Sequence, residues 1–437
     1  MVAAAQPREQ PGAPVPGASA QPELSPRLGR LFGELDRRAV SWCVLRRDDE
    51  LARAGDDVDL LVHPEQLEAV LPVLQELDFV ELPASGRGSH RFFLGYDAAA
   101  GLWLQLDIVT ELAFGRLLCL KTDAAPSCLA RRRRRGGVPV LAQDDALWAL
   151  LLHCLLDRRG VTPADQTRLE RIARSATAGG ALERAVADRC PAFEPREIEA
   201  AVRRADWAAV AAAGRELGRS WTRARLGSVG IELARAVPRR IAEKPFVALR
   251  RPGLIVAVLG IDGAGKSTLV DRLSREVPLP ARVVYGGLWR TRDAGRRRDA
   301  VARVLRPAFR IGVVWARYSR ARYHRAVGRL VLFDRYTYDA LLPPRPPLVV
   351  LKRLYFRLLA SSCPRPDLLV LLDLPGSVAA VRRAGESPAE LETQRQSFLE
   401  LQRRVPDLVV LDATRSFGRV KADAGAAVWR RYQERRA

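Results

Sequence analysis

Residues 254–275 read LIVAVLGIDGAGKSTLVDRLSR, and they indicate the fold of the C-terminal part of the chain. An apolar run leads into a glycine-rich turn, and a helical pattern follows from Leu269. The turn, from Gly260 to Ser267, matches the pattern G-x-x-x-x-G-K-[ST] in the strand-loop-helix context that the pattern requires. Glycines let successive main-chain N–H groups point inward at an anion, at the positive end of the helix. The stretch therefore predicts a phosphate-binding loop.

The residue types in this loop indicate ATP with Mg²⁺ as the ligand. Lys266 is expected to reach the β- and γ-phosphates, and the hydroxyl of Ser267 to bind Mg²⁺. The chain has only five Lys among its 72 basic residues, so a lysine at this position indicates that a compact point charge is needed. The residues expected to hold ATP are Gly260, Asp262, Gly263, Ala264, Gly265, Lys266, Ser267 and Thr268.

Apolar runs of strand length recur through the C-terminal part of the chain. The strand candidates are Leu254–Leu259, Arg282–Tyr285, Arg329–Phe333, Leu368–Leu372 and Leu408–Leu411. Continuous runs of this kind are typical of strands that are buried on both faces. They predict an α/β fold, a doubly wound parallel sheet of about five strands with helices on either side.

The preceding part of the chain shows a different pattern. Strands are expected at Trp42–Leu45, Val58–Val62 and Leu102–Ile108, and a helix at Glu65–Leu77, which together predict an α+β unit. The basic run Arg131–Arg135 stands beside two glycines and is expected to form a loop. From Asp144 onward the pattern is helical. The expected division is a disordered tail at 1–23, an α+β domain at 24–140, a helical extension at 141–242, a linker at 243–252 and the phosphate-loop domain at 253–437.

The C-terminal part resembles the thymidylate kinase family of nucleoside monophosphate kinases. The resemblance rests on the phosphate loop, on Phe333-Asp334-Arg335-Tyr336, on the lid-like stretch from Arg382 to Phe398, and on Leu411-Asp412-Ala413-Thr414. It implies a kinase that positions two anions and neutralises the charge of the transferred group. The implied catalytic residues are Lys266, Asp334, Arg335, Arg382 and Arg383, with Asp373 in the magnesium shell and Ala413 and Thr414 beside the adenine.

The acceptor stays open at this point. Where the family carries a segment that shapes the acceptor site, this chain has Tyr285-Gly286-Gly287-Leu288-Trp289-Arg290, followed by the Arg-rich stretch 296–325. The acceptor is thymidine monophosphate, or another phosphate, sugar or polyol that suits a basic pocket lined by aromatic residues.

Aspartates in the N-terminal part suggest a second site. Asp57 and Asp59 stand two apart on a strand and so point the same way, and Asp107 lies on another expected strand. Three convergent carboxylates suit a site for two magnesium ions. The segment from Ser41 to Leu112 resembles the nucleotidyltransferase superfamily, which implies a nucleotidyltransferase-like domain. An Asp-rich turn beside an edge strand is the alternative.

The net charge, the cysteines and the apolar runs of the chain limit its expected partners and location. The net charge of +22 favours a solvated basic surface in an Arg- and Ala-rich chain, with nucleic acid the less favoured partner. Six scattered cysteines and the lack of a long apolar run predict a soluble cytoplasmic protein. The first hypothesis is an ATP-dependent kinase; the alternatives are a nucleotidyltransferase with a nucleotide-binding partner domain, and a nucleic-acid-dependent ATPase. The oligomeric state is open, a homodimer included.

Overall fold

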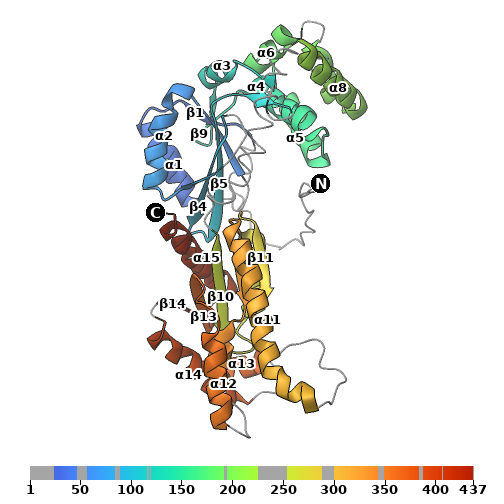
Figure 1. Cartoon of the computed structure of the whole chain (residues 1–437). Helices are drawn as coiled ribbons and strands as arrows, with labels where there is room; N and C mark the ends of the chain where they lie inside the picture. Colours follow the sequence, from blue (N-terminus) through green and yellow to red (C-terminus); the bar gives the residue numbers. More distant parts are fainter. Residues whose placement is uncertain are drawn as a thin grey trace.

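Two β-sheets organise the chain, and Figure 1 shows them one above the other with helices around each. The computed structural model describes residues 24–46, 57–83, 89–115, 118, 120–190, 194–224, 253–287, 300–342, 349–382, 387–405 and 407–436. The expected tail at 1–23 and the linker at 243–252 lie outside the described residues.

The C-terminal sheet has the predicted strands. These are β10 (Leu254–Gly260), β11 (Ala281–Tyr285), β12 (Leu330–Asp334), β13 (Leu368–Asp373) and β14 (Leu408–Asp412). Their order is β11-β12-β10-β13-β14, and every neighbouring pair is parallel. All residues of β10 are buried, so both faces of the sheet are covered. The prediction of a five-stranded parallel α/β sheet is confirmed.

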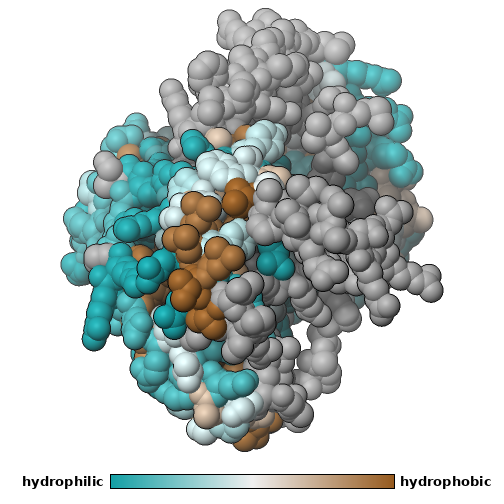
Figure 2. Space-filling model, turned by 60° about the horizontal axis from the view of Figure 1, so that its bottom comes forward, coloured by the Kyte–Doolittle hydropathy of each residue, from teal (hydrophilic) through white to brown (hydrophobic). Residues whose placement is uncertain are grey.

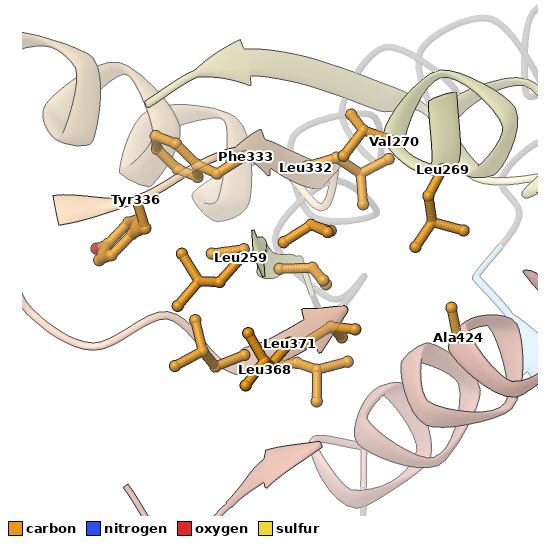
Figure 3. Close-up of a cluster of buried hydrophobic side chains, with 14 of the residues drawn as sticks. Leu259, Leu269, Val270, Leu332, Phe333, Tyr336, Leu368, Leu371 and Ala424 are labelled. Carbon is orange, nitrogen blue, oxygen red and sulfur yellow. The ribbon is translucent and has the colours of Figure 1, made fainter. Parts of the chain in front are cut away.

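The hydrophobic core of the C-terminal part lies between the central strands and the helices that cover the sheet. The helical elements are α10 (Lys266–Glu276), α11 (Ala300–Ala326), η4 (Thr337–Leu341), α12 (Val349–Ser361), α13 (Gly376–Arg382), α14 (Pro388–Leu399), η5 (Glu400–Arg403) and α15 (Phe417–Glu434). Figure 3 shows Leu259, Leu332 and Leu371 of the three central strands in one cluster, with Leu269 of α10 and Ala424 of α15. Burying each large apolar side chain stabilises the fold by roughly 1.5–3 kcal/mol. This packing holds the carboxyl ends of the strands at one edge.

The N-terminal sheet is mixed and larger than predicted. Its order is β3-β4-β5-β2-β1-β9-β8, with β2–β5 and β1–β9 parallel and the other pairs antiparallel. The strands are β1 (Trp42–Val44), β2 (Asp57–Val62), β3 (Val80–Leu82), β4 (Arg91–Asp97), β5 (Leu102–Val109), β8 (Arg133–Arg135) and β9 (Val138–Val140). β6 (Ala113–Phe114) and β7 (Leu120–Lys121) form a separate pair. The α+β character is confirmed, but the sequence pattern missed β3, β4, β8 and β9.

The basic run Arg131–Arg135 is not a loop as expected. Arg133–Arg135 form the edge strand β8, which is antiparallel to β9. Gly136 and Gly137 connect the two strands and have φ of +55° and +83°, which suits a two-residue hairpin turn. Exposed charged side chains are well tolerated on an edge strand, so charge alone was a poor guide here.

Helices complete the N-terminal part. They are α1 (Pro26–Arg37), η1 (Pro64–Gln66), α2 (Leu67–Glu76), α3 (Ala125–Ala130), α4 (Gln143–Leu152), a π-helical turn η3 (His153–Arg158), α5 (Pro163–Ala173), α6 (Ala181–Arg189), α7 (Pro195–Arg203) and α8 (Trp207–Ala224). The helical pattern predicted after Asp144 is confirmed as far as residue 224, where the described part ends. Among the helices described, none is long and apolar enough to cross a membrane. Five cysteines are buried and free, and Cys119 lies outside the described residues.

Helix α15 joins the two sheets. Tyr96 of β4 donates a hydrogen bond of 2.8 Å from its hydroxyl to the carbonyl of Ala422, and Trp103 of β5 meets Trp429 edge to face at 5.8 Å. A Cβ at Gly425 would lie 2.5 Å from the Tyr96 hydroxyl, so only glycine permits this approach. Tyr96 and Trp103 belong to the same buried cluster as the C-terminal sheet. The two parts therefore share a core.

One helix leaves an apolar face outside the core. Figure 2 shows an apolar patch on the end of the molecule that carries α12. Val350, Leu351, Leu354 and Leu358 of α12 are exposed, whereas Leu359 and Ala360 are buried. α12 is therefore packed through Tyr355, Phe356 and its C-terminal turn, and these four apolar side chains lie at the surface.

Candidate active site

The loop between β10 and α10 has the backbone that its glycines predict. Gly260 has φ of +141°, and a Cβ there would lie 2.7 Å from the carbonyl oxygen of Leu372 on β13. Gly265 has φ of +91° and directly precedes α10. Residues other than glycine rarely adopt these backbone conformations, so glycine is required at both positions. The turn brings the start of α10 toward the carboxyl ends of the strands.

Lys266 lies buried beneath the loop. Its side chain is 5 % exposed, and its Nζ donates to the carbonyls of Gly260 and Ile261, each at 2.8 Å. Burial lowers the pKa of Lys266, the charge of Arg335 lowers it further, and Asp262 and Asp339 oppose the shift. Because carbonyl dipoles satisfy the ammonium group only in part, a phosphate beside it would compensate this charge more fully.

Ser267 and Asp334 make an oxygen pair beside the loop. The Ser267 hydroxyl donates 2.7 Å to Oδ2 of Asp334 at the end of β12. Oδ1 of Asp334 is buried and has no hydrogen-bond partner among the described residues. Hydroxyl and carboxylate oxygens are the ligands that Mg²⁺ prefers, and an unsatisfied buried oxygen lacks a positive partner. The pair fits a magnesium ion.

Arg335 bridges two aspartates around Lys266. Its guanidinium is paired with Asp262 in the loop and lies 3.4 Å from Oδ2 of Asp339 in η4. Arg335 has φ of +73°, an uncommon backbone conformation for a residue with a side chain. Strain of this kind is often found at functional sites. Arg335 and Lys266 therefore lie in one network of charges.

Asp339 is a member of this network that the sequence analysis missed. It is buried, and its Oδ1 has no hydrogen-bond partner among the described residues. Burial raises its pKa to about 6, although Arg335 and Lys266 act in the opposite direction. The signal available in the sequence was its position four residues after Arg335, close enough along the chain for the two side chains to meet although Arg335 itself lies before η4.

The end of α13 lies against the loop. A Cβ at Gly263 would lie 3.2 Å from the carbonyl oxygen of Ala379 and 3.7 Å from the Cβ of Arg382. Arg382 is the last residue of α13 and is exposed. Arg383, the other predicted lid arginine, lies outside the described residues. The structure thus brings Arg382 beside the loop.

Asp373 is bound by a side chain of helix α14. Arg395 contacts both oxygens of Asp373, at 2.5 and 2.9 Å, and also donates to Glu392 at 2.7 Å. Hydrogen bonds from the backbone of Gly376, from Gln396 and from Arg395 lower the pKa of Glu392 to about 2. Sequence reasoning missed Arg395, because no local pattern links it to Asp373. The magnesium role of Asp373 stays a prediction.

Ala413 and Thr414 follow β14 at the same edge of the sheet. The backbone N–H of Ala413 donates 2.8 Å to the carbonyl of Asp373. The Thr414 hydroxyl and N–H both donate to Oδ1 of Asp412, at 2.5 and 2.9 Å, and these bonds lower the pKa of Asp412. The turn that was expected beside the adenine is therefore tied to the end of β13.

The N-terminal aspartates also lie on neighbouring parallel strands. Asp59 of β2 stands opposite Asp107 of β5. Arg46 pairs with Asp59 at 2.8 Å, and His90 contacts Asp107 at 2.8 Å. Asp57 stands in β2 two residues before Asp59, and its side chain lies outside the described residues. Within the described residues no group of three or more metal-ligating side chains lies together, so the predicted two-magnesium site stays a prediction.

Comparisons with known proteins place the chain in a family. No protein-family model matches it. The thymidylate kinase of Xanthomonas campestris pv. campestris strain B100 is 35 % identical over 218 residues, which cover 42 % of this chain and 86 % of that protein. The thymidylate kinase of Xanthomonas euvesicatoria pv. vesicatoria is 30 % identical over the same shares, and the probable thymidylate kinase of Thermococcus gammatolerans is 31 % identical over 35 % of this chain and 79 % of that protein. With the loop, Ser267, Asp334 and Arg335 assembled at one edge of a parallel sheet, this similarity shows that the chain belongs to the thymidylate kinase family.

Proposed function

We propose that this protein is an ATP-dependent kinase that transfers the γ-phosphoryl group to a nucleoside monophosphate, with thymidine monophosphate as the first candidate acceptor. One observation carries the proposal: Lys266, the Ser267–Asp334 pair and Arg335 surround a single glycine-rich loop. The relatives' names supply the candidate acceptor. Phosphoryl transfer needs mainly positioning and charge neutralisation, and this set of residues offers both.

Each residue has a defined part in the proposed reaction. Lys266 exchanges its carbonyl partners for the β- and γ-phosphates, and Ser267 and Asp334 hold Mg²⁺. When bound, Mg²⁺ neutralises charge on the phosphate oxygens. Arg335 exchanges Asp262 for the acceptor phosphate, to which its planar guanidinium can bind in a bidentate manner.

The lid and the adenine-side turn complete the proposed site. Arg382, at the end of α13 against Gly263, and Arg383 after it would approach the γ-phosphoryl group and exclude water. Ala413 and Thr414 would line the adenine from the turn after β14. Asp373 would contribute to the magnesium shell once Arg395 releases it.

Residues around the end of β11 support an acceptor with an aromatic base. Arg317 of α11 lies 5.9 Å from the ring centre of Tyr285 and donates 3.0 Å to the carbonyl of Gly287. Gly286 approaches the backbone of Arg335 so closely that a Cβ would lie 2.2 Å from its carbonyl oxygen. Tyr285 therefore stands beside the arginine proposed for the acceptor phosphate, where its ring can stack on a nucleobase.

The N-terminal aspartates support a second, separate proposal. Asp59 and Asp107 stand opposite each other on parallel strands, and they would suit a nucleotidyl-transfer site completed by Asp57 and Mg²⁺ once Arg46 and His90 release them. Product analysis distinguishes this activity from the kinase, because nucleotidyl transfer from ATP releases pyrophosphate whereas the kinase reaction releases ADP.

A substrate panel tests the kinase proposal. The full chain is incubated with Mg·ATP and one of several nucleoside monophosphates, sugar phosphates or polyols, and the products are identified by mass spectrometry. We expect thymidine monophosphate to gain one phosphoryl group as ADP forms. Lys266→Ala should lower the rate at least about a thousandfold, whereas the control Lys121→Ala, far along the chain on β7, should not change it. Release of free phosphate with every acceptor would reduce the assignment to an ATPase and contradict the proposal.

A further inference from the structure

Helix α12 carries a row of apolar side chains on its solvent side. Val350, Leu354 and Leu358 follow one another at intervals of four residues, and Leu351 lies beside them. In chain order, these four side chains are 83 %, 62 %, 68 % and 58 % exposed. The row extends over two helical turns, about 12 Å along the helix axis. Single exposed apolar side chains are common, but several together mark an interaction surface. We call these four residues the α12 face.

The α12 face is held outward by the packing of the rest of the helix. Tyr355 and Phe356 pack against the hydrophobic core of the C-terminal part, and Leu359 and Ala360 belong to that core. Because these residues fix the rotation of the helix about its axis, the α12 face cannot turn inward without exposing them. Figure 2 shows an apolar patch at this end of the molecule, with hydrophilic residues beside it. The exposed apolar row is therefore a fixed feature of the surface.

The charges on α12 are all positive. They belong to Lys352, Arg353 and Arg357, and the helix contains no Asp or Glu. Arg353 and Arg357 are exposed and stand directly before Leu354 and Leu358, so they run along one side of the α12 face. The net charge of the whole chain is +22. A partner that complements this surface combines an apolar interior with negative charge.

These properties favour a lipid surface over a protein partner. A second copy of the chain, bound through the same face, would bring the basic side chains of two α12 helices together, and like charges oppose association. A partner helix would need a groove to lie in. The cavity of about 220 Å³ beside α12 is lined by Phe356 and Arg357 and by none of the α12 face. A bilayer needs no groove, because protruding apolar side chains can enter between its headgroups.

We propose that the α12 face binds the surface of an anionic lipid bilayer. The helix lies in the plane of the interface, with its apolar row at the acyl chains and Arg353 and Arg357 at the level of the headgroups. Figure 1 shows α12 at the end of the molecule opposite the N-terminal sheet, so a flat surface can reach the helix without meeting that sheet. The proposal goes beyond the kinase activity and does not depend on it, because none of these residues belongs to the candidate active site.

Sedimentation of the full chain with lipid vesicles tests the proposal. One set of vesicles contains phosphatidylcholine with roughly a third of phosphatidylglycerol, which is anionic, and the other contains phosphatidylcholine alone. We expect the protein to sediment with the anionic vesicles and to bind the neutral ones at least about tenfold more weakly, because a neutral surface does not attract Lys and Arg. Added salt should weaken the binding without abolishing it, since salt screens charges but does not weaken apolar insertion.

Matched apolar variants locate the binding on the molecule. L354Q/L358Q removes two leucines of the α12 face, and W315Q/Y323Q removes two exposed aromatic residues of α11. Binding to the anionic vesicles should weaken by about tenfold in the first variant and stay within about twofold in the second. Both variants should melt at the temperature of the unchanged protein, because the substituted side chains are exposed.

Matched arginine variants test the part played by charge. R353Q/R357Q removes the arginines beside the α12 face, and R30Q/R204Q removes two exposed arginines of the N-terminal part. The first variant should bind the anionic vesicles several times more weakly than the second, because only the first pair lies at the headgroups in the proposed complex.

Several results would overturn the proposal. Unchanged vesicle binding in L354Q/L358Q would remove the α12 face from the contact, and equal weakening in the two arginine variants would mean general attraction by a basic protein. A lower melting temperature of L354Q/L358Q would show that its leucines stabilise the fold instead. If the unchanged chain is a dimer in analytical ultracentrifugation and L354Q/L358Q is a monomer, the α12 face belongs to a second copy of the chain.

Discussion

The two sheets carry aspartates in similar places but compensate their charges differently. In the C-terminal sheet, Asp334 ends a parallel strand with one buried oxygen that has no partner among the described residues. In the N-terminal sheet, Asp59 and Asp107 stand on neighbouring parallel strands, and each has a partner side chain, Arg46 and His90. Strand topology alone therefore does not make a metal site, because the neighbouring side chains decide whether an ion is still needed.

The basic residues of the C-terminal site are already paired. Lys266 and Arg335 lie in a network with two aspartates, so a nucleotide must exchange existing contacts for its own. This arrangement holds the two cations in a defined geometry before a nucleotide binds.

The largest expected effect distinguishes the aspartates of the two sheets. Asp334→Ala should lower the rate of phosphoryl transfer by roughly 10²–10³-fold, because the proposed magnesium ion loses a ligand. Asp59→Ala and Asp107→Ala should leave that rate unchanged. The rates are measured with thymidine monophosphate over a range of magnesium concentrations, with Asp271→Ala on the exposed side of α10 as the control. A full rate in Asp334→Ala would show that the comparison between the sheets is wrong.

A smaller effect concerns the buried Asp339. Because burial raises its pKa to about 6, it loses its charge as the pH falls through about 6, and its ion pair with Arg335 weakens. The rate of the kinase should fall over the same range. Asp339→Asn should be slower by about tenfold at neutral pH and should lack this acid limb. The measurement is the rate from pH 5 to pH 8 for both proteins, and an unchanged acid limb in the variant would rule Asp339 out as its source.

The raised pKa of Asp339 also makes the free energy of unfolding depend on pH. Its pKa in the folded protein is raised above the ordinary value of 3.8, so the folded state binds this proton more tightly than the unfolded state. Its contribution to the free energy of unfolding is therefore fully present below about pH 4 and is lost as the pH rises through about 6. Asp339→Asn should flatten this part of the stability profile, which denaturant titrations at several pH values would detect.

The smallest effect tests the contact between the two regions. Tyr96→Phe removes the hydrogen bond to the carbonyl of Ala422 and should lower the free energy of unfolding by about 1 kcal/mol. Urea titration measures it, with the exposed Tyr323→Phe as the control. If the variant loses stability in one cooperative transition, the two sheets unfold together; an unchanged midpoint would mean that the contact contributes nothing measurable.

Much of the fold was predictable, and the errors have physical causes. The five strands of the C-terminal sheet were predicted because each contains an apolar run, and the three central strands β10, β12 and β13 are buried on both faces. β8 was missed because a strand at an edge can be fully charged. β4 was missed although it lies directly before β5 in the chain and pairs with it as a hairpin. In the candidate site, the contact between Ser267 and Asp334 joins two motifs that the sequence had identified separately.

The phosphate loop and the parallel sheet around it follow from local properties of the chain, the backbone conformation at glycines and the pattern of apolar runs. Which charges meet depends on the packing of the folded chain: Arg335 meets Asp262, and Arg395 meets Asp373. Such partners lie far apart in the chain or on different elements, and only packing brings them close enough for electrostatic attraction or repulsion to act.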